Sequence, residues 1–168
     1  QMPITLVYSP NNSINQGLGI GWSISVASFD PENRVLNHPN GGNWALDDGQ
    51  SSSGYYTLKH QKIKDFIFKD AGDGNYCIWN SSGDAVIIDP TNYVIGNNYC
   101  QLATMMFNAS GDQISFEFDP SGRISKILDG DKTELLTTMY SGSTATIKLF
   151  PSNKFEKIYS FTIQNNYL

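Results

Sequence analysis

The stretch FDPSGRISKI, residues 118–127, contains a complete hairpin turn between two apolar strand ends. Phe118 ends the first strand. Asp119 can accept hydrogen bonds from the backbone two residues further on, and Pro120 sets the φ angle that a type I turn requires. Gly122 then adopts the left-handed conformation that residues with a Cβ atom resist. The stretch therefore predicts a hairpin loop of roughly three to five residues with a bulge.

The same turn recurs four more times along the chain. Two close copies, FDPENRVL at residues 29–36 and LFPSNKFEKI at residues 149–158, place Asn33 and Asn153 where the first copy has glycine. Asparagine tolerates the left-handed conformation best after glycine. Because the copies are unevenly spaced, they predict a series of hairpins rather than a strict solenoid. The two looser copies cover residues 79–86 and 107–114.

Alternation of apolar and polar residues dominates the remaining sequence. WSISVASF, residues 22–29, places Trp22 in phase with two aliphatic residues, so Trp22 is expected in the core. About a dozen short strands, with a turn signal roughly every ten residues, predict an all-β meander of consecutive antiparallel hairpins. This meander is expected to form a curved, twisted sheet or two packed sheets. The expected strands cover residues 4–8, 22–29, 44–46, 55–59, 63–69, 76–79, 85–88, 102–107, 114–118, 124–128, 135–140, 145–150 and 158–163.

Composition favours one acidic domain. The 168 residues carry a formal net charge of −5, and no change of composition marks a linker, so we expect a single domain over residues 1–168. An acidic chain without a basic stripe is a poor nucleic-acid binder. No apolar run is long enough for a membrane-spanning helix, and the opening residues QMPITLVYSPNN do not have the pattern of a signal peptide.

Few residues could carry catalysis. His38 and His60 lie in polar stretches without a nucleophile motif beside them, and we expect both to be exposed. Asp47 and Asp48 could serve as the paired carboxylates of a glycosidase. The sequence DDG at this point is also typical of hairpin turns, which is the interpretation that we favour. We therefore expect no enzymatic activity.

Metal and cofactor sites are not expected either. The acidic loops at residues 70–75 and 129–134 lack the ligand spacing of calcium-binding loops, and their Asp and Gly residues suit tight turns. Cys77 and Cys100 do not form a C-x-x-C motif. They are expected to be buried free thiols, and a single disulfide between them is the less favoured alternative.

Aromatic residues could instead form a binding surface. Trp44 lies close in sequence to two carboxylates, and adjacent strand residues such as Tyr55 and Tyr56 face opposite ways, so at least one of the two should be exposed. A binding surface requires these side chains to gather in an exposed concavity. The candidate binding residues, called the aromatic–acidic set below, are Trp44, Asp47, Asp48, Tyr55 and Tyr56.

The stretch FDPSGRISKILDG, residues 118–130, resembles the YD repeat of RHS proteins, with phenylalanine where tyrosine is usual. The matching residues are Phe118, Asp119, Gly122, Arg123, Ile124, Asp129 and Gly130. The opening of the chain also resembles the start of RHS-type shells, through Tyr8, Gly19, Gly21, Trp22 and Asp48–Gly49. The residues that we expect to form the turns and the core are Gly21, Trp22, Phe118, Asp119, Gly122, Arg123, Asn33 and Asn153.

This resemblance implies a structural function. In RHS proteins the hairpins form a long β-sheet that spirals into a hollow shell, which commonly encloses the toxic C-terminal domain of a bacterial toxin, and teneurin ectodomains use a related shell. The resemblance implies that this chain is a non-catalytic segment of such a β-shell, either an N-terminal piece of one or a truncated relative. The implied partners are the rest of a larger shell or a second copy paired through strand edges. A toxin cargo and a cell-surface glycan are further candidate partners.

The same resemblance implies export by a dedicated secretion system, with the protein in the cytoplasm before export. Neither a nucleic-acid partner nor membrane insertion is expected. Two other functions stay open at this point. One is a carbohydrate- or cell-surface-binding module that uses the aromatic–acidic set. The other is a glycosidase, which needs two carboxylates that face each other across a cleft.

Overall fold

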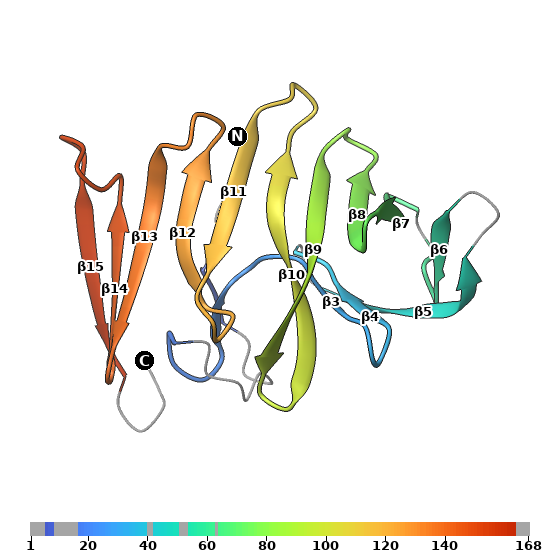
Figure 1. Ribbon diagram of the computed structural model, residues 1–168, viewed down its shortest axis with the longest axis horizontal. Helices are drawn as coiled ribbons and strands as arrows, with labels where there is room; N and C mark the ends of the chain where they lie inside the picture. Colours follow the sequence, from blue (N-terminus) through green and yellow to red (C-terminus); the bar gives the residue numbers. More distant parts are fainter. Residues whose placement is uncertain (1–5, 9–16, 40–41, 51–53, 63, 164–168) are drawn as a thin grey trace. The chain divides into compact units, whose positions relative to one another are not determined.

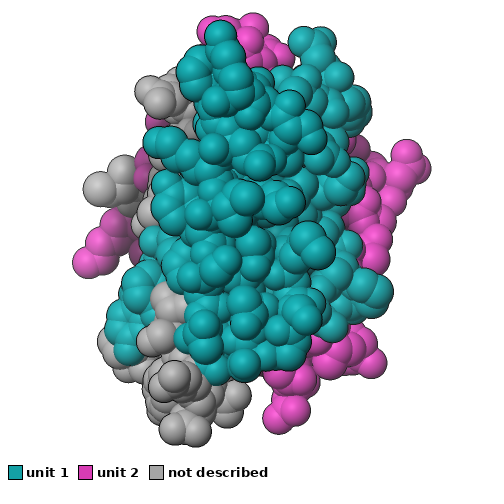
Figure 2. Space-filling view, turned by 90° about the vertical axis from the view of Figure 1, so that its left-hand side faces the viewer, with its two compact units in different colours: residues 1–25, 114–168 teal, residues 26–113 magenta. Residues whose placement is uncertain are grey.

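The computed structural model describes residues 6–8, 17–39, 42–50, 54–62 and 64–163, apart from the side chains of 48–50 (Figure 1). These residues form strands and turns, and no helix that could cross a membrane occurs among them. The predicted all-β architecture is confirmed. The chain divides into two compact units (Figure 2). Unit 1 comprises residues 1–25 and 114–168, and unit 2 comprises residues 26–113.

Unit 2 is a closed, eight-stranded antiparallel barrel. Each strand pairs with the next one along the chain, and the last strand also pairs with the first, which closes the ring. Closure satisfies the backbone groups that an open sheet leaves unpaired at its edges. The strands are β3 (Ser28–Asp30), β4 (Val35–Asn37), β5 (Asn43–Gln50), β6 (Tyr55–Leu58), β7 (Phe66–Gly72), β8 (Asn75–Asn80), β9 (Ala85–Ile95) and β10 (Asn98–Phe107).

The core of unit 2 consists of alternate residues from these strands. Phe68 on β7 lies opposite Ile78 on β8, which in turn lies opposite Val86 on β9, and all three are buried. Cross-strand partners share a face of the sheet, so the alternation in each strand places one apolar row inside. The buried core cluster is Ala27, Phe29, Leu36, Leu46, Leu58, Phe66, Phe68, Ile78, Val86, Ile88 and Ala103.

The long hairpin of β9 and β10 extends well beyond the strands predicted at 85–88 and 102–107. A register shift between Gln101 and Ala103 accommodates Pro90, which cannot donate a hydrogen bond to a regular ladder. The side-chain amide of Gln101 donates to the carbonyl oxygen of Pro90 at 3.3 Å and to Oδ1 of Asn92 at 3.1 Å. The irregular segment is therefore held from the opposite strand.

Unit 1 contains a series of antiparallel hairpins and a separate two-stranded ribbon. The ribbon joins β1 (Leu6–Tyr8) to β2 (Trp22–Ile24). In the series, each of the four neighbouring pairs is antiparallel and consecutive along the chain, as the meander prediction required. Its strands are β11 (Gln113–Phe118), β12 (Ile124–Asp129), β13 (Glu134–Ser141), β14 (Thr144–Leu149) and β15 (Lys157–Thr162).

The predicted strand at residues 22–29 is wrong in one respect, because it is divided into β2 and β3. The two pieces belong to different units, and only the second contributes to the barrel. Trp22 is half-buried rather than part of a buried core, with its ring centroid 5.1 Å from that of Tyr8. The expectation of a single domain over residues 1–168 stays a prediction, which one cooperative unfolding transition would support.

Candidate functional site

Four hairpin loops share one hydrogen-bonding pattern. In each, the first residue donates its N–H to the carbonyl oxygen four residues on, and the fourth residue donates its N–H back to the first, at 2.8–3.1 Å. The fourth residue has φ between 66° and 89°. This is the type I turn with a bulge that the sequence predicted. The first residues are Asn80, Asn108, Asp119 and Asp129, and the left-handed residues are Gly83, Gly111, Gly122 and Lys132.

The side chain of the first residue explains why Asp or Asn occupies that position. Oδ1 of Asp119 accepts hydrogen bonds from the N–H groups of Ser121 at 2.9 Å and Arg123 at 3.0 Å. Asn108 and Asp129 accept the equivalent pairs. The carboxylate of Asp129 is thus engaged by its own loop, as expected for a turn residue rather than a calcium ligand.

Asn33 and Asn153 do not take the place of Gly122, and this prediction is wrong. In the copy at residues 29–36 the left-handed residue is Arg34, and in the copy at 149–158 the left-handed residues are Phe150 and Ser152. Asn33 instead bonds to Asp30, through its N–H to Oδ1 at 2.9 Å and its amide to Oδ2 at 2.8 Å. Asn153 accepts a hydrogen bond from the N–H of Phe155 at 3.2 Å. Both asparagines stabilise loops of a different length.

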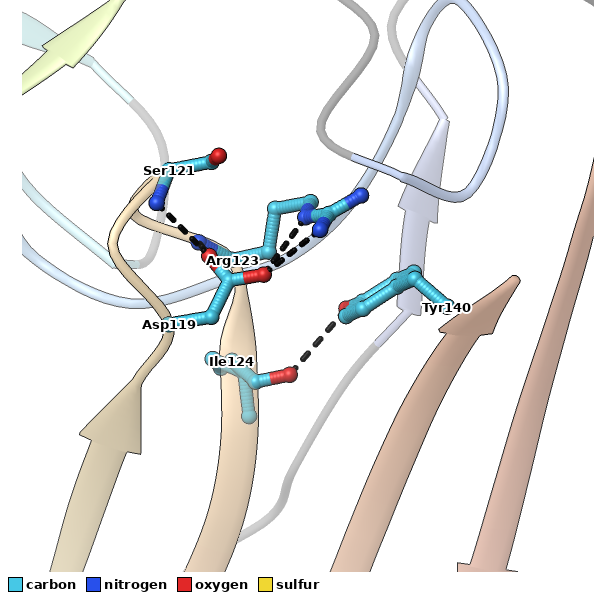
Figure 3. A network of polar contacts seen from close by, with 5 residues as sticks. All are labelled: Asp119, Ser121, Arg123, Ile124 and Tyr140. Atoms are coloured by element: carbon cyan, nitrogen blue, oxygen red, sulfur yellow. Dashed lines mark hydrogen bonds and ion pairs between the residues drawn. The ribbon is translucent and has the colours of Figure 1, made fainter. Parts of the chain in front are cut away.

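The loop between β11 and β12 carries an additional cluster around Arg123 (Figure 3). Its Nε and Nη2 atoms both lie 2.7 Å from Oδ2 of Asp119. The guanidinium carbon lies 4.2 Å from the ring centroid of Tyr140, and the Tyr140 hydroxyl donates to the carbonyl oxygen of Ile124 at 3.1 Å. A planar cation over an aromatic face is favourable. The cluster therefore ties β13 to the loop between β11 and β12.

Gly17 completes this cluster from the chain before β2. Its φ is +92°, and an added Cβ would lie 2.4 Å from Cε1 of Tyr140 and 2.8 Å from Cδ of Arg123. The backbone at Gly17 therefore approaches the side chains of Arg123 and Tyr140 too closely for a residue with a Cβ atom. We call Gly17, Asp119, Arg123 and Tyr140 the arginine clamp. The sequence pattern identified Asp119 and Arg123 but not their distant partners.

The pKa shifts of Asp119 and Tyr140 agree with the contacts in the arginine clamp. Burial alone would raise the pKa of Asp119, but the hydrogen bonds and charge of Arg123 and the N–H of Ser121 outweigh it and hold that pKa below its ordinary value. Burial raises the pKa of Tyr140 to about 12, so its hydroxyl stays a hydrogen-bond donor. The clamp is an arrangement that holds backbone, and its polar groups are engaged with one another.

The aromatic–acidic set does not gather on one exposed face. Trp44 packs against the core of unit 2, with its ring 5.8 Å from Phe66, and Tyr56 packs 5.4 Å from Phe68. Tyr55 is exposed, as expected for one of the adjacent pair. The backbone oxygen of Asp47 accepts a hydrogen bond from Arg34 at 3.1 Å. The side chain of Asp48 lies outside the described residues.

Trp79 is an exposed aromatic residue that the sequence reasoning did not select. Its exposed fraction is 46%, and Nζ of Lys69 lies 5.0 Å from the ring centroid. Trp79 borders a hollow of about 290 Å³ together with Asp65, Asn80 and Ser81. The signal in the sequence is that Trp79 directly follows Ile78 and so is out of phase with it. In the structure Ile78 is buried, and Trp79 lies opposite Ile67 in the β7–β8 ladder.

A second hollow lies within unit 1 and is almost wholly apolar. We call it the apolar groove, and its volume is about 390 Å³. Apolar walls around a space of this size are typical of surfaces that bind other apolar groups. The groove is lined by Leu6, Ile24, Leu135, Leu136, Ile147, Leu149, Phe150, Tyr159 and Phe161.

His38 differs from the exposed histidine that the sequence predicted. It is half-buried in unit 2, and its ring lies 4.5 Å from that of Phe66. Burial lowers the pKa of His38, against the opposing effects of a hydrogen bond with Asn80 and the charge of Asp65. His60 is exposed, as expected.

The part of the chain that the structure describes contains no candidate metal site. No three His, Cys, Asp or Glu side chains gather there in a way that could hold a metal ion. Cys77 is buried and Cys100 is half-buried, and both are free thiols whose pKa values are raised by burial. The favoured prediction for the two cysteines is confirmed for Cys77, while Cys100 is less buried than expected.

The comparisons with known proteins add no relative. No family model matches the sequence, and no curated protein is similar to it. The resemblance to RHS proteins therefore rests on the motif residues of the sequence alone.

Proposed function

We propose that the chain is a non-catalytic structural segment of an encapsulating β-shell of the RHS/YD-repeat type. The observation that carries this proposal is the repeated loop pattern, in which four loops with one geometry fold successive strands back alongside each other. A repeated hairpin makes a continuous wall, since each loop returns the chain next to the strand that it has just left.

The arginine clamp supports the same function. Asp119 and Arg123 bind the loop backbone and each other, and Arg123 also packs on Tyr140. These contacts hold one hairpin in register with the next, which is what a wall requires. In this proposal the protein reaches the outside of the cell through a dedicated secretion system, and the rest of the shell or a second copy covers its open edge.

Solution mass tests the proposal. The chain has a mass of 18.6 kDa, and an open strand edge is a template for pairing with another chain. Size-exclusion chromatography with light scattering should give a mass above this value that rises with protein concentration. A mass of 18.6 kDa at every concentration would contradict a wall segment, and would favour a self-contained domain.

A carbohydrate- or cell-surface-binding module is the second candidate, and exposed Trp79 favours it. Aromatic faces beside amide and carboxylate groups suit the apolar and polar sides of a sugar ring. A glycan array with the wild-type chain and a Trp79→Ala variant tests this function. Tyr99→Ala is the matched control, because Tyr99 has the same exposed fraction of 46%. Binding that Trp79→Ala abolishes and Tyr99→Ala retains would support the module.

A further inference from the structure

The outer edge of β15 presents three residues whose backbone groups point away from β14. The N–H of Ile163 donates to the carbonyl oxygen of Ser143 at 2.7 Å, and the β14–β15 register is unbroken. Hydrogen-bonded pairs alternate in an antiparallel ladder, so residues 157, 159 and 161 also bond to β14. Residues 158, 160 and 162 therefore direct their N–H and C=O groups outward. No strand pairs with this side of β15 among the described residues.

This edge is complementary to itself. A twofold axis perpendicular to the sheet at Ser160 would place Ser160 opposite Ser160 of a second copy, and Ile158 opposite Thr162 of that copy. Three hydrogen-bonded pairs result, and each exchanges two bonds, so the contact contains about six. A twofold axis at Tyr159 would use only two such pairs within β15. The register centred on Ser160 is therefore the one that satisfies all the outward groups.

The side chains fit the same register. Tyr159 would face Phe161 of the second copy, an aromatic pair on the sheet face that lines the apolar groove. Lys157 would face Ile163, so no like charges meet. Ile158 and Tyr159 have exposed fractions of 55% and 46%, which leaves apolar area for the contact to bury. In unit 2, by contrast, each of the strands β3 to β10 already has two neighbours.

We infer that β15 pairs antiparallel with β15 of a second copy of this chain, centred on Ser160. This inference rests on the proposed function, because it identifies the edge through which the wall segment associates. The second copy would extend the five-strand series of unit 1 into one continuous sheet and lengthen the apolar groove across the twofold axis. A contact made by one short strand per chain is small, so the dimer should be concentration-dependent.

Proline at the centre of the contact provides the first test. Ser160→Pro removes the outward N–H without touching the β14 ladder, and proline is tolerated on edge strands when its missing N–H faces solvent. Ser160→Ala keeps that N–H and is the matched control. Sedimentation velocity over a concentration series should show the same dimer for wild type and Ser160→Ala. Ser160→Pro should raise the dissociation constant roughly ten-fold or more.

Two charge variants test the register and do not depend on proline. Ile158→Glu with Thr162→Glu would place glutamates opposite each other in the dimer, whereas Ile158→Glu with Thr162→Lys would place glutamate opposite lysine. Both positions are exposed, and a glutamate at position 158 would lie opposite Lys148 of β14, so the fold should tolerate either pair. The Glu/Glu variant should be monomeric and the Glu/Lys variant should dimerise.

The outcomes separate this inference from the proposed function. The β15 contact is overturned if the wild-type chain associates, Ser160→Pro has the same dissociation constant, and the two charge variants dimerise equally. Assembly would then use another edge. A wild-type chain that is monomeric at every concentration overturns both.

Discussion

Replacing Gly17 with alanine tests whether the chain before β2 is held against the arginine clamp because it lacks a side chain. Two costs arise. Alanine at a φ of +92° is strained by about 1–3 kcal/mol. Its Cβ would also lie 2.4 Å from Cε1 of Tyr140, and displacing a packed ring costs about 1–3 kcal/mol. The free energy of unfolding should therefore fall by about 2–6 kcal/mol.

The two costs can be separated with a control at a similar backbone angle. Gly111 has a φ of +87°, and nothing lies within 4 Å of the Cβ position. Gly111→Ala should therefore show the backbone cost alone. Urea unfolding, followed by circular dichroism and tryptophan fluorescence, gives both free energies.

A second background tests the ring contact itself. In a Tyr140→Ala chain the ring is absent, so the added cost of Gly17→Ala should shrink toward that of Gly111→Ala. Equal costs for Gly17→Ala and Gly111→Ala in the wild-type background would refute the packing of Gly17 on Tyr140. An unchanged cost of Gly17→Ala after removal of the ring would refute it as well.

Three further predictions concern the turns and the titrating groups. Gly122→Val should lower the free energy of unfolding by about 1–3 kcal/mol in urea melts, and Asn153→Gly should cost much less, because Gly122 has a φ of 74° and Asn153 is not left-handed. The pKa of Asp119 is lowered in the fold, so its ionised carboxylate stabilises the fold above the unfolded pKa of about 4, and this stabilisation is lost as the pH falls below that value. Asp119→Asn should therefore reduce the dependence of the free energy of unfolding on pH in this range. An unchanged dependence would contradict the ion pair with Arg123. The pKa of His38 is also lowered, so the fold should lose stability as the pH falls through about 6.5. His38→Gln should remove that loss, and exposed His60→Gln should retain it; the opposite pattern would argue against a buried, neutral His38.

The hairpins could be predicted because their determinants are local. The loop between β11 and β12 follows from Asp119, Pro120 and Gly122, which lie within four positions and need no distant partner. Period-two alternation likewise specifies extended backbone and its apolar face. These two signals account for the all-β fold and for most strand positions.

Features that depend on the choice of partner strand could not be predicted. Residues 22–26 alternate regularly and Phe29 follows out of phase with them, but alternation does not state which strand each half pairs with, so β2 and β3 read as one. In the sequence, Trp44 is a surface candidate because the carboxylates of Asp47 and Asp48 follow closely. Its cross-strand partner is buried Leu36, which places Trp44 on the inner face.

The arginine clamp shows the same limit at the candidate site. The pairing of Asp119 with Arg123 is visible in the motif, since four residues separate them across one loop. Tyr140 and Gly17, by contrast, contact Arg123 from segments that lie far from this loop in the sequence. Only the antiparallel order of β12 and β13 brings Tyr140 over the guanidinium, and only the backbone approach of Gly17 leaves room for it.

The closure of the barrel also has a consequence for how unit 2 folds. Seven of its eight strand pairings join neighbours along the chain, but the pairing of β3 with β10 joins Ser28 to Leu102, which are 102 − 28 = 74 residues apart. The entropy lost in closing a loop grows with its length, so this seam is the most expensive contact to nucleate. The order of events should be local hairpins first and the seam last. Before the seam forms, β3 and β10 both present open edges, so the folding intermediate of unit 2 should be the species most prone to strand exchange between chains.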